Sequence, residues 1–367
     1  MFTITANDPD HALVEGIRLL ERYGYREESR VGPVIVAPTS VATVYLSPTN
    51  RVSTSALRDA NPFFHLTEAL WMLGGRNDVA LPAYYAPRLA TFSDDGKTLH
   101  GAYGFRWREY FGIDQLDLVI KELTRNRATR RCVLAMWDSG SADDDGVNHG
   151  DLVTAMAGGK DVPCNTHAYF MVRAGKLDMT VCCRSNDIVW GAYGANVVHF
   201  SMLLEYVAVS VGLPIGTYTQ FSNNYHAYIE RPDTLRLFEA SHESPPAPTR
   251  ATWVSLFSEP RERVTFDHEL SLFLNDDGTA LARVYHNQFL RRVALPMKEA
   301  FALYKKSNML LQAALGPKEV LAEYEKNIAS AILKLAKTGI DWHEAGIAWL
   351  DRRLTSRRIK AEEVRPA

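Results

Sequence analysis

The residues with the greatest chemical potential lie in two segments, Pro163-Cys164-Asn165-Thr166 and Arg184-Ser185-Asn186-Asp187. Cysteine is the strongest side-chain nucleophile near neutral pH when its thiolate is accessible. An arginine fork beside a hydroxyl suits a phosphate, and Asp187 adds a carboxylate to the same neighbourhood. A lone cysteine is more often a small buried hydrophobe, but the polar residues after Cys164 favour a reactive role. The combination suits attack on an electron-poor ring that carries an anionic group.

A carboxylate interrupts an apolar stretch earlier in the chain. Glu68 lies within the run Phe64–Leu73, among leucines and a tryptophan. Burial there would disfavour the charged carboxylate and suit Glu68 to carry a proton. The alternative is that Glu68 faces water beside His65 and Arg76, and the spacing alone does not separate the two.

Three further groups have both a binding and a structural interpretation. Asn196 precedes an apolar helix. Its side-chain amide could bind a carbonyl and an adjacent N–H of a ligand at the same time, or it could cap the helix. His226 and Tyr228 share one face of a strand and could bind sugar hydroxyls or only pack. Arg130 and Arg131 precede an apolar strand, where they could contact an anion or be ordinary surface charge.

The composition excludes several classes of protein. The chain has 367 residues, 46% of them hydrophobic and 23% charged, with a net charge of -2. Polyanion-binding domains usually carry a basic excess, so a nucleic-acid polymer is not expected as a partner. Four cysteines fit no zinc spacing and indicate reduced thiols, so we expect no metal. The polar residues 1–10 are no signal peptide, and no apolar run approaches a membrane span, which predicts a cytoplasmic protein.

These chemical groups must be positioned by helices and strands that the hydrophobic pattern indicates. Residues 138–161, acidic and rich in Gly, Ser and Asp, are typical of a long surface loop. A hairpin is expected at Ala174-Gly175. The pattern predicts helices over 11–23, 62–73, 116–123 and 197–211, and strands within 34–46, 132–137, 167–173 and 177–183.

The composition changes after about residue 290. We therefore expect a catalytic domain over 1–290 and a helical C-terminal extension over 291–367. Residues 311–315 and 317–337 are helical in pattern. The basic end of the extension is typical of a solvated face, and it contains Arg352, Arg353, Arg357 and Arg358.

Taken together, these segments resemble the thymidylate synthase family over about residues 10–275. Six motifs occur in the family's order, which makes the resemblance specific. They are Glu68-Ala69-Leu70-Trp71, Tyr103-Gly104-Phe105-Arg106-Trp107-Arg108, Thr129-Arg130-Arg131, Pro163-Cys164, Arg184-Ser185-Asn186-Asp187 with Gly191 and Asn196, and His226-Ala227-Tyr228.

The resemblance implies an α/β (α+β) fold, with a large mixed sheet flanked by helices. It implies a homodimer formed sheet to sheet, in which Arg130 and Arg131 reach the phosphate bound by the neighbouring subunit. The implied substrate is a pyrimidine nucleoside monophosphate, and the implied one-carbon donor is 5,10-methylenetetrahydrofolate.

The resemblance also assigns catalytic roles. Cys164 would add to carbon 6 of the pyrimidine, which makes carbon 5 nucleophilic. Glu68 would manage the proton at the carbonyl oxygen, and Tyr103 would relay the carbon 5 proton. Asp187 would orient the folate and the waters of the site.

Binding roles follow in the same way from the resemblance. Arg30, Arg184 and Ser185 would hold the phosphate together with the partner's arginines. Asn165 would bind the substrate, Asn196 would contact the base, and His226 and Tyr228 would bind the sugar hydroxyl. Trp107 would contact the folate.

The departures from the methylating members indicate the product. Asn165 replaces the usual His, Cys183 replaces a Gln, and residues 88–94 lack the tryptophan that flanks the folate. A helical extension also replaces the short tail that excludes water. A site of this kind favours water over hydride as the group that quenches the intermediate. The pattern resembles phage-type hydroxymethylases, so we expect 5-hydroxymethyl-dUMP, made for phage DNA modification in the host cytoplasm.

Alternative functions remain open from the sequence. They are methylation of dUMP, hydroxymethylation of CMP or dCMP, and a non-catalytic nucleotide-binding dimeric scaffold. Asn196 favours uracil, since cytidylate enzymes of the family tend to have Asp there. However, the segment 191–196 is one residue longer than in the methylating enzymes, so Ala195 could instead face the base. Ribose and deoxyribose are not distinguished.

Overall fold

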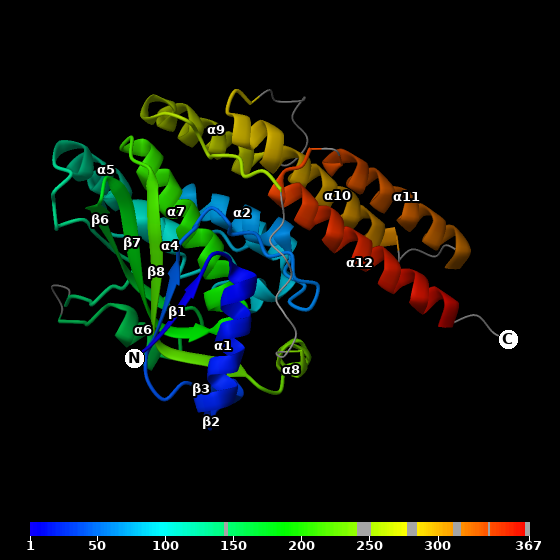
Figure 1. Ribbon diagram of the computed structural model, residues 1–367, viewed down its shortest axis with the longest axis horizontal. Helices are drawn as coiled ribbons and strands as arrows, with labels where there is room; N and C mark the ends of the chain where they lie inside the picture. Colours follow the sequence, from blue (N-terminus) through cyan, green and yellow to red (C-terminus); the bar gives the residue numbers. More distant parts are fainter. Residues whose placement is uncertain (143–145, 241–250, 277–284, 311–316, 337, 364–367) are drawn as a thin grey trace.

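The computed structural model describes residues 1–142, 146–240, 251–276, 285–310, 317–336 and 338–363. Within these residues an eight-stranded mixed sheet forms the centre of the molecule, in the order β1-β4-β8-β7-β6-β5, with β3 also paired to β8 and β2 to β3 (Figure 1). The strands are β1 (Phe2–Ala6), β2 (Tyr25–Ser29), β3 (Gly32–Val36), β4 (Val41–Tyr45), β5 (Val133–Ala135), β6 (Asn165–Arg173), β7 (Lys176–Asp187) and β8 (Ile215–Tyr228).

The pairing of the two longest strands brings the chemical groups together. β7 and β8 run parallel, and their register places Asp187 beside His226. The motif that begins at Arg184 and the histidine motif therefore end at the same edge of the sheet. The hairpin between β6 and β7 is confirmed, because Ala174 and Gly175 have φ angles of 47° and 75°, as a tight two-residue turn requires.

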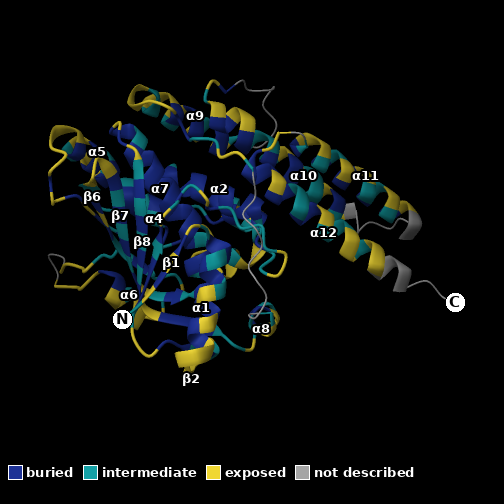
Figure 2. Ribbon diagram, in the orientation of Figure 1, coloured by how far each residue is buried: buried dark blue, intermediate teal, exposed yellow. Residues whose placement is uncertain are grey.

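Two helices, α2 (Pro62–Leu73) and α7 (Asn196–Ser210), are almost entirely buried beside the sheet (Figure 2). α2 begins where the sequence predicts, since the side chain of Asn61 accepts a hydrogen bond from the N–H of Phe64 and Pro62 occupies the first helical position. The remaining helices are α1 (Pro9–Tyr23), α3 (Ala80–Tyr85), α4 (Tyr103–Arg108), α5 (Gln115–Arg125), α6 (Asp151–Met156), α8 (Pro232–Glu239), α9 (Arg263–Asn275), α10 (Leu295–Leu310), α11 (Pro317–Leu335) and α12 (Asp341–Glu363).

The four helices predicted before residue 212 are confirmed as α1, α2, α5 and α7. The strand predicted over 132–137 is wrong in length, because β5 ends at Ala135. The N–H groups of Met136 and Trp137 both donate to the carbonyl of Thr166, so the chain bends there. The loop predicted over 138–161 is also wrong in part, since it contains the helix α6.

The C-terminal helices α10, α11 and α12 lie side by side and project from the sheet (Figure 1). Of these, α10 and α12 pack on α2, where the ring of Phe63 lies 5.4 Å from that of Phe301 and 5.6 Å from that of Trp349. Arg352 and Arg353 pair with Asp59 at 2.9 and 2.8 Å. This part of the basic end is therefore not the solvated face that the sequence predicts.

The described parts of the extension are helical over Leu295–Leu310, Pro317–Leu335 and Asp341–Glu363. The predicted segment 311–315 lies outside the described residues. The boundary at residue 290 stays a prediction, because a π-helical segment, Leu290–Ala294, joins directly to α10.

Candidate active site

A cavity of about 890 Å³ lies where the motif-bearing ends of β7 and β8 meet the hairpin β2–β3 and the helix α6. Cavities that bind small molecules usually measure about 300–1,000 Å³. Most of the predicted site residues line it, although they come from distant parts of the chain. They are Arg30, Tyr103, Cys164, Arg184, Ser185, Asp187, Asn196, His226 and Tyr228.

The backbone around Cys164 is held by Arg184. The guanidinium of Arg184 donates to the carbonyls of Pro163 and Val162 at 2.8 and 2.9 Å, and its backbone N–H donates to the carbonyl of Cys164 at 2.8 Å. Burial raises the pKa of the Cys164 thiol, and the charges of Arg184 and Arg30 oppose this shift. Arg184 therefore both positions the nucleophile and favours its thiolate.

Three side-chain amides form a chain behind the cavity. Asn165 donates to the oxygen of Asn196, Asn196 donates to the oxygen of Asn186, both at 3.1 Å, and Asn186 donates to Ser222 at 2.8 Å. Asn196 is thus held on both sides with its amide at the cavity wall. The alternative role as a helix cap is wrong, because Asn196 is the first residue of α7 and its side chain is engaged by the other amides.

The segment before Asn196 is π-helical, over Ile188–Ala195. A π turn spans one residue more than an α turn, and such turns occur mostly at functional sites. It accommodates the additional residue that the sequence shows here. Asn196 lines the cavity and Ala195 is not among its lining residues, which favours Asn196 as the residue that faces the base.

Asp187 and His226 lie beside each other on the adjacent strands β7 and β8. The carboxylate of Asp187 accepts the N–H groups of Val189 and Trp190 at 3.3 and 3.0 Å, which anchors the π-helical segment. Burial raises the pKa of Asp187 and lowers that of His226, and the attraction between them opposes both shifts. The rings of His226 and Tyr228 meet edge to face, 5.2 Å apart.

Glu68 is buried on α2, so the alternative in which it faces water is wrong. Its carboxylate lies 2.8 Å from Nε2 of the buried His199. Sequence reasoning missed His199, although the three-residue spacing from Asn196 places both on one face of α7. Glu68 itself does not line the cavity and lies behind its wall. Tyr103 contacts Asn165, the residue after Cys164: its hydroxyl accepts the backbone N–H of Asn165 at 3.3 Å.

Comparison with known proteins identifies the family. The model of the thymidylate synthase family matches residues 26–252. The chain belongs to the thymidylate synthase family. It is 43% identical to deoxyuridylate hydroxymethyltransferase of Pseudomonas phage M6, over 96% of this chain and 95% of that protein. It is 30% identical to the enzyme of that name from Bacillus phage SP01, over 75% and 73% of the two chains. A putative thymidylate synthase of Methanococcoides burtonii is 35% identical, over 39% of this chain and 59% of that protein.

Two of the predicted family contacts are not made within this chain. Arg130 and Arg131 are exposed and do not line the cavity, so their role in a neighbouring subunit stays a prediction. Trp107 is completely buried, with its ring 6.1 Å from that of Phe200. This placement does not agree with the expected direct contact between Trp107 and folate, because the Trp107 side chain lies in the core and not at the cavity.

The cavity around Cys164 is also lined by aromatic residues that sequence reasoning missed. Trp137 and Trp190 line it together with Phe92, although residues 88–94 contain no tryptophan. The guanidinium of Arg184 lies 5.8 Å from the centre of the Trp137 ring. Trp190 could have been found from its position three residues after Asp187, whereas no local pattern pointed to Trp137.

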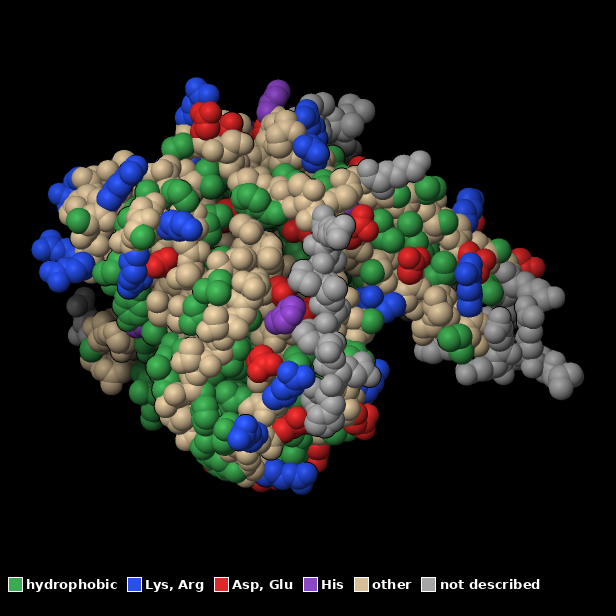
Figure 3. All heavy atoms as spheres, viewed as in Figure 1, with side chains coloured by type: hydrophobic (Ala, Val, Ile, Leu, Met, Phe, Trp, Pro, Cys, Tyr) green, Lys and Arg blue, Asp and Glu red, His purple; other side chains and the backbone are tan. Residues whose placement is uncertain are grey.

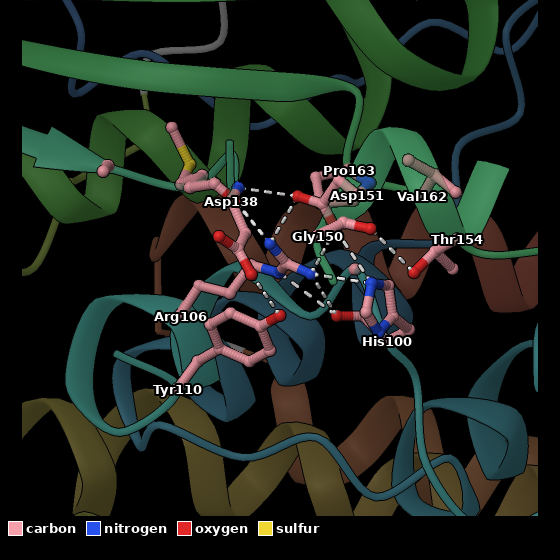
Figure 4. A network of polar contacts seen from close by, with 12 residues as sticks. His100, Arg106, Tyr110, Asp138, Gly150, Asp151, Thr154, Val162 and Pro163 are labelled. Atoms are coloured by element: carbon pink, nitrogen blue, oxygen red, sulfur yellow. Dashed lines mark hydrogen bonds and ion pairs between the residues drawn. The ribbon is translucent and has the colours of Figure 1, made fainter. Parts of the chain in front are cut away.

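A buried ion pair holds the helix α6 against α4 (Figure 4). Two guanidinium nitrogens of Arg106 bond the Asp151 carboxylate at 2.7 and 2.8 Å, and both side chains are fully buried. His100 contacts the same carboxylate at 2.8 Å. Burial would raise the pKa of Asp151, but the bonds from His100 and Arg106 outweigh it and lower that pKa. The anchored α6 places Leu152 on the cavity wall.

In the described ranges, no three His, Cys, Asp or Glu side chains gather as a metal site would require. No helix in the same ranges is long and apolar enough to cross a membrane.

Proposed function

We infer that this chain is a deoxyuridylate hydroxymethyltransferase, which transfers a one-carbon unit to carbon 5 of dUMP and adds water to give 5-hydroxymethyl-dUMP. The observation that carries this proposal is the similarity to the Pseudomonas phage M6 enzyme, which extends over 96% of the chain. The putative thymidylate synthase of Methanococcoides burtonii matches only 39% of it. We further propose that the enzyme is phage-encoded and acts in the host cytoplasm.

The cavity has parts that suit a nucleotide. Arg30, Arg184 and Ser185 offer cationic and hydroxyl donors for the phosphate. Asn196 offers an N–H and an oxygen to the edge of uracil. His226 and Tyr228 lie where β8 ends and would bind the sugar hydroxyl.

The other part of the cavity fits methylenetetrahydrofolate. Apolar and aromatic side chains there, including Leu89, Phe92 and Trp190, suit a flat ring system. Arg88 and Lys160 add positive charge that a carboxylated tail could use. When bound, the folate supplies the one-carbon unit, and Asp187 and Trp190 are the residues placed to orient it.

The chain's own residues then divide the chemistry. Cys164 adds to carbon 6 of uracil, and the electron density that this creates makes carbon 5 nucleophilic. Glu68 manages the proton of the carbonyl oxygen from behind the cavity wall, with its carboxylate 2.8 Å from Nε2 of His199. Tyr103, beside the backbone of Asn165, relays the proton lost from carbon 5.

The product distinguishes the candidate functions. Incubated with dUMP and methylenetetrahydrofolate, the enzyme should give a nucleotide with the mass of 5-hydroxymethyl-dUMP, without stoichiometric dihydrofolate. Only the methylating route oxidises the folate, so dihydrofolate equal to product would establish thymidylate synthase instead. A non-catalytic scaffold would release no tritium from carbon 5 of dUMP. Mass spectrometry and the absorbance of dihydrofolate measure the two quantities.

We also propose that two copies pair through the sheet face opposite α7. The register places Val133 beside Tyr169 on this face, and each is 43% exposed. Figure 3 shows hydrophobic side chains along the side of the view where β6 and β7 lie. Arg130 and Arg131 lie just before β5, the strand that contains Val133, at the margin of the proposed interface. From there they would reach the phosphate in the partner's cavity.

A subunit-mixing experiment tests the shared site. Arg131→Ala and Cys164→Ala should each be inactive alone. Each mixed dimer keeps one site with neither change, so equimolar subunits after exchange should recover about a quarter of wild-type activity. Product formation after refolding the two together measures this. Arg127→Ala, an exposed arginine in the same segment, serves as the matched control and should be active alone. No recovery by a mixture shown to be dimeric would exclude the contribution across subunits.

A further inference from the structure

Asp161 is a cavity carboxylate with no role in the chemistry described so far. Asp161 lines the cavity together with Cys164, three residues later. Three extended residues span at most about 10 Å, so the two side chains share one region. The charge of Asp161 is near enough to raise the pKa of the Cys164 thiol.

The position of Asp161 is set by Gly101. The N–H of Gly101 donates to Oδ2 of Asp161 at 2.8 Å. A Cβ atom on residue 101 would lie only 2.9 Å from Oδ1, so the carboxylate rests directly on a glycine. Among the described residues, no donor bonds Oδ1, which leaves this oxygen available to a water molecule.

The environment of Asp161 makes its carboxylate a stronger base than an ordinary aspartate. Burial raises the pKa of Asp161, and the nearby Asp94 raises it further. The Gly101 hydrogen bond and the charges of His100 and Arg106 oppose this shift. A carboxylate with a raised pKa accepts a proton from water more readily than an ordinary one.

The other carboxylates near the nucleophile are less available. Both oxygens of Asp187 accept backbone N–H groups that hold the π-helical segment. Glu68 lies behind the wall, 2.8 Å from His199. Asp161 is therefore the carboxylate whose cavity position and free oxygen fit a bound water.

We propose that Asp161 accepts a proton from the water molecule that adds to the one-carbon unit on carbon 5, an inference that rests on the proposed function. The water oxygen forms a bond to the exocyclic methylene carbon while its proton moves to Asp161. The electron pair of the exocyclic double bond moves onto the base as an enolate. The enolate then re-forms the ring double bond and breaks the bond between carbon 6 and Cys164, which leaves as a thiolate. Asp161 returns its proton to solvent, and no oxidant or reductant is needed.

The variant Asp161→Asn separates this step from those before it. Release of tritium from carbon 5 precedes water addition and should stay within about threefold of wild type. Formation of 5-hydroxymethyl-dUMP should fall about a hundredfold, the usual contribution of a general base. Denatured protein should accumulate the mass of Cys164 joined to the nucleotide and its methylene group, and equilibrium binding of dUMP should be unchanged. Asp161→Glu should restore part of the rate.

Asp94→Asn is the matched control, since Asp94 is exposed and accepts the N–H of Lys160 in the same wall. Because it removes only a charge that raises the pKa of Asp161, its rates of tritium release and product formation should match wild type at a pH above that pKa. An unchanged rate of product formation in Asp161→Asn would overturn the proposal, as would equal losses of tritium release and product. Methyl product from the wild type would instead refute the proposed function, whatever Asp161 does.

The pH profile gives an independent measure. Asp161 must be a carboxylate to accept the proton, so product formation should rise as the pH rises through its raised pKa. The groups that act on it are His100, Arg106, Asp94 and Cys164. Tritium release precedes the step assigned to Asp161 and should lack this limb. Asp161→Asn should remove the limb from product formation, and a limb that persists would contradict the assignment.

Discussion

Replacing Cys164 by alanine should reduce tritium release from carbon 5 of dUMP by at least about a thousandfold, because no other group can form the bond to carbon 6. The covalent species seen by mass spectrometry should disappear as well. Binding of dUMP should change little, since the phosphate and base contacts come from other residues. Tritium release and equilibrium binding, measured on one preparation, separate loss of the nucleophile from loss of the fold.

Cys182→Ala provides the matched control. Cys182 is half-buried on β7 and does not line the cavity, so its removal should leave tritium release unchanged. If Cys164→Ala kept measurable release while Cys182→Ala lost it, the nucleophile would be assigned to the wrong thiol.

Asn196→Asp should lower kcat/KM for dUMP by about 10- to 100-fold and raise it for dCMP, because an unmatched polar edge in a buried site costs about 1–3 kcal/mol. The aspartate would still accept the hydrogen bond from Asn165. It could no longer donate to the oxygen of Asn186. The side-chain amide of Asn186 would therefore flip, so that its N–H donates to the new carboxylate and its oxygen accepts a hydrogen bond from the Ser222 hydroxyl. The site therefore keeps its shape while the edge presented to the base changes. Steady-state kinetics with both nucleotides measure the exchange.

Asn223→Asp is the control for the added charge, since Asn223 is exposed on β8 and does not line the cavity. It should retain the wild-type preference. An Asn196→Asp enzyme that still prefers dUMP by the wild-type ratio would show that another residue identifies the base.

The sequence predicts those parts of the site that short motifs carry. Cys164, Arg184 and Asp187 could be placed together because one strand begins just after Cys164 and the next strand in the sequence, its hairpin partner, ends at Asp187. The helix α2 could be bounded because Pro62 and the glycines after Leu73 act locally. Such signals depend on a few adjacent residues and need no knowledge of tertiary structure.

Contacts between distant segments could not be predicted in this way. His199 meets Glu68 only because α7 packs on α2. The motif that contains Trp107 indicates proximity to the site but not the direction of the side chain. The helix α6 lies in a segment of weak helical preference, and a bond from Arg106, 45 residues earlier in the chain, holds its first residue.

The buried pair of Arg106 and Asp151 limits how this enzyme can be recombined with its relatives. A chimaera that imports a different 138–161 segment without an acidic partner would leave the Arg106 charge uncompensated in the protein interior. Removing one member of such a pair costs about 3–5 kcal/mol, enough to unfold many domains. The segment 138–161 can therefore be exchanged only when position 106 is exchanged with it. Positions 106 and 151 should be inherited as a unit.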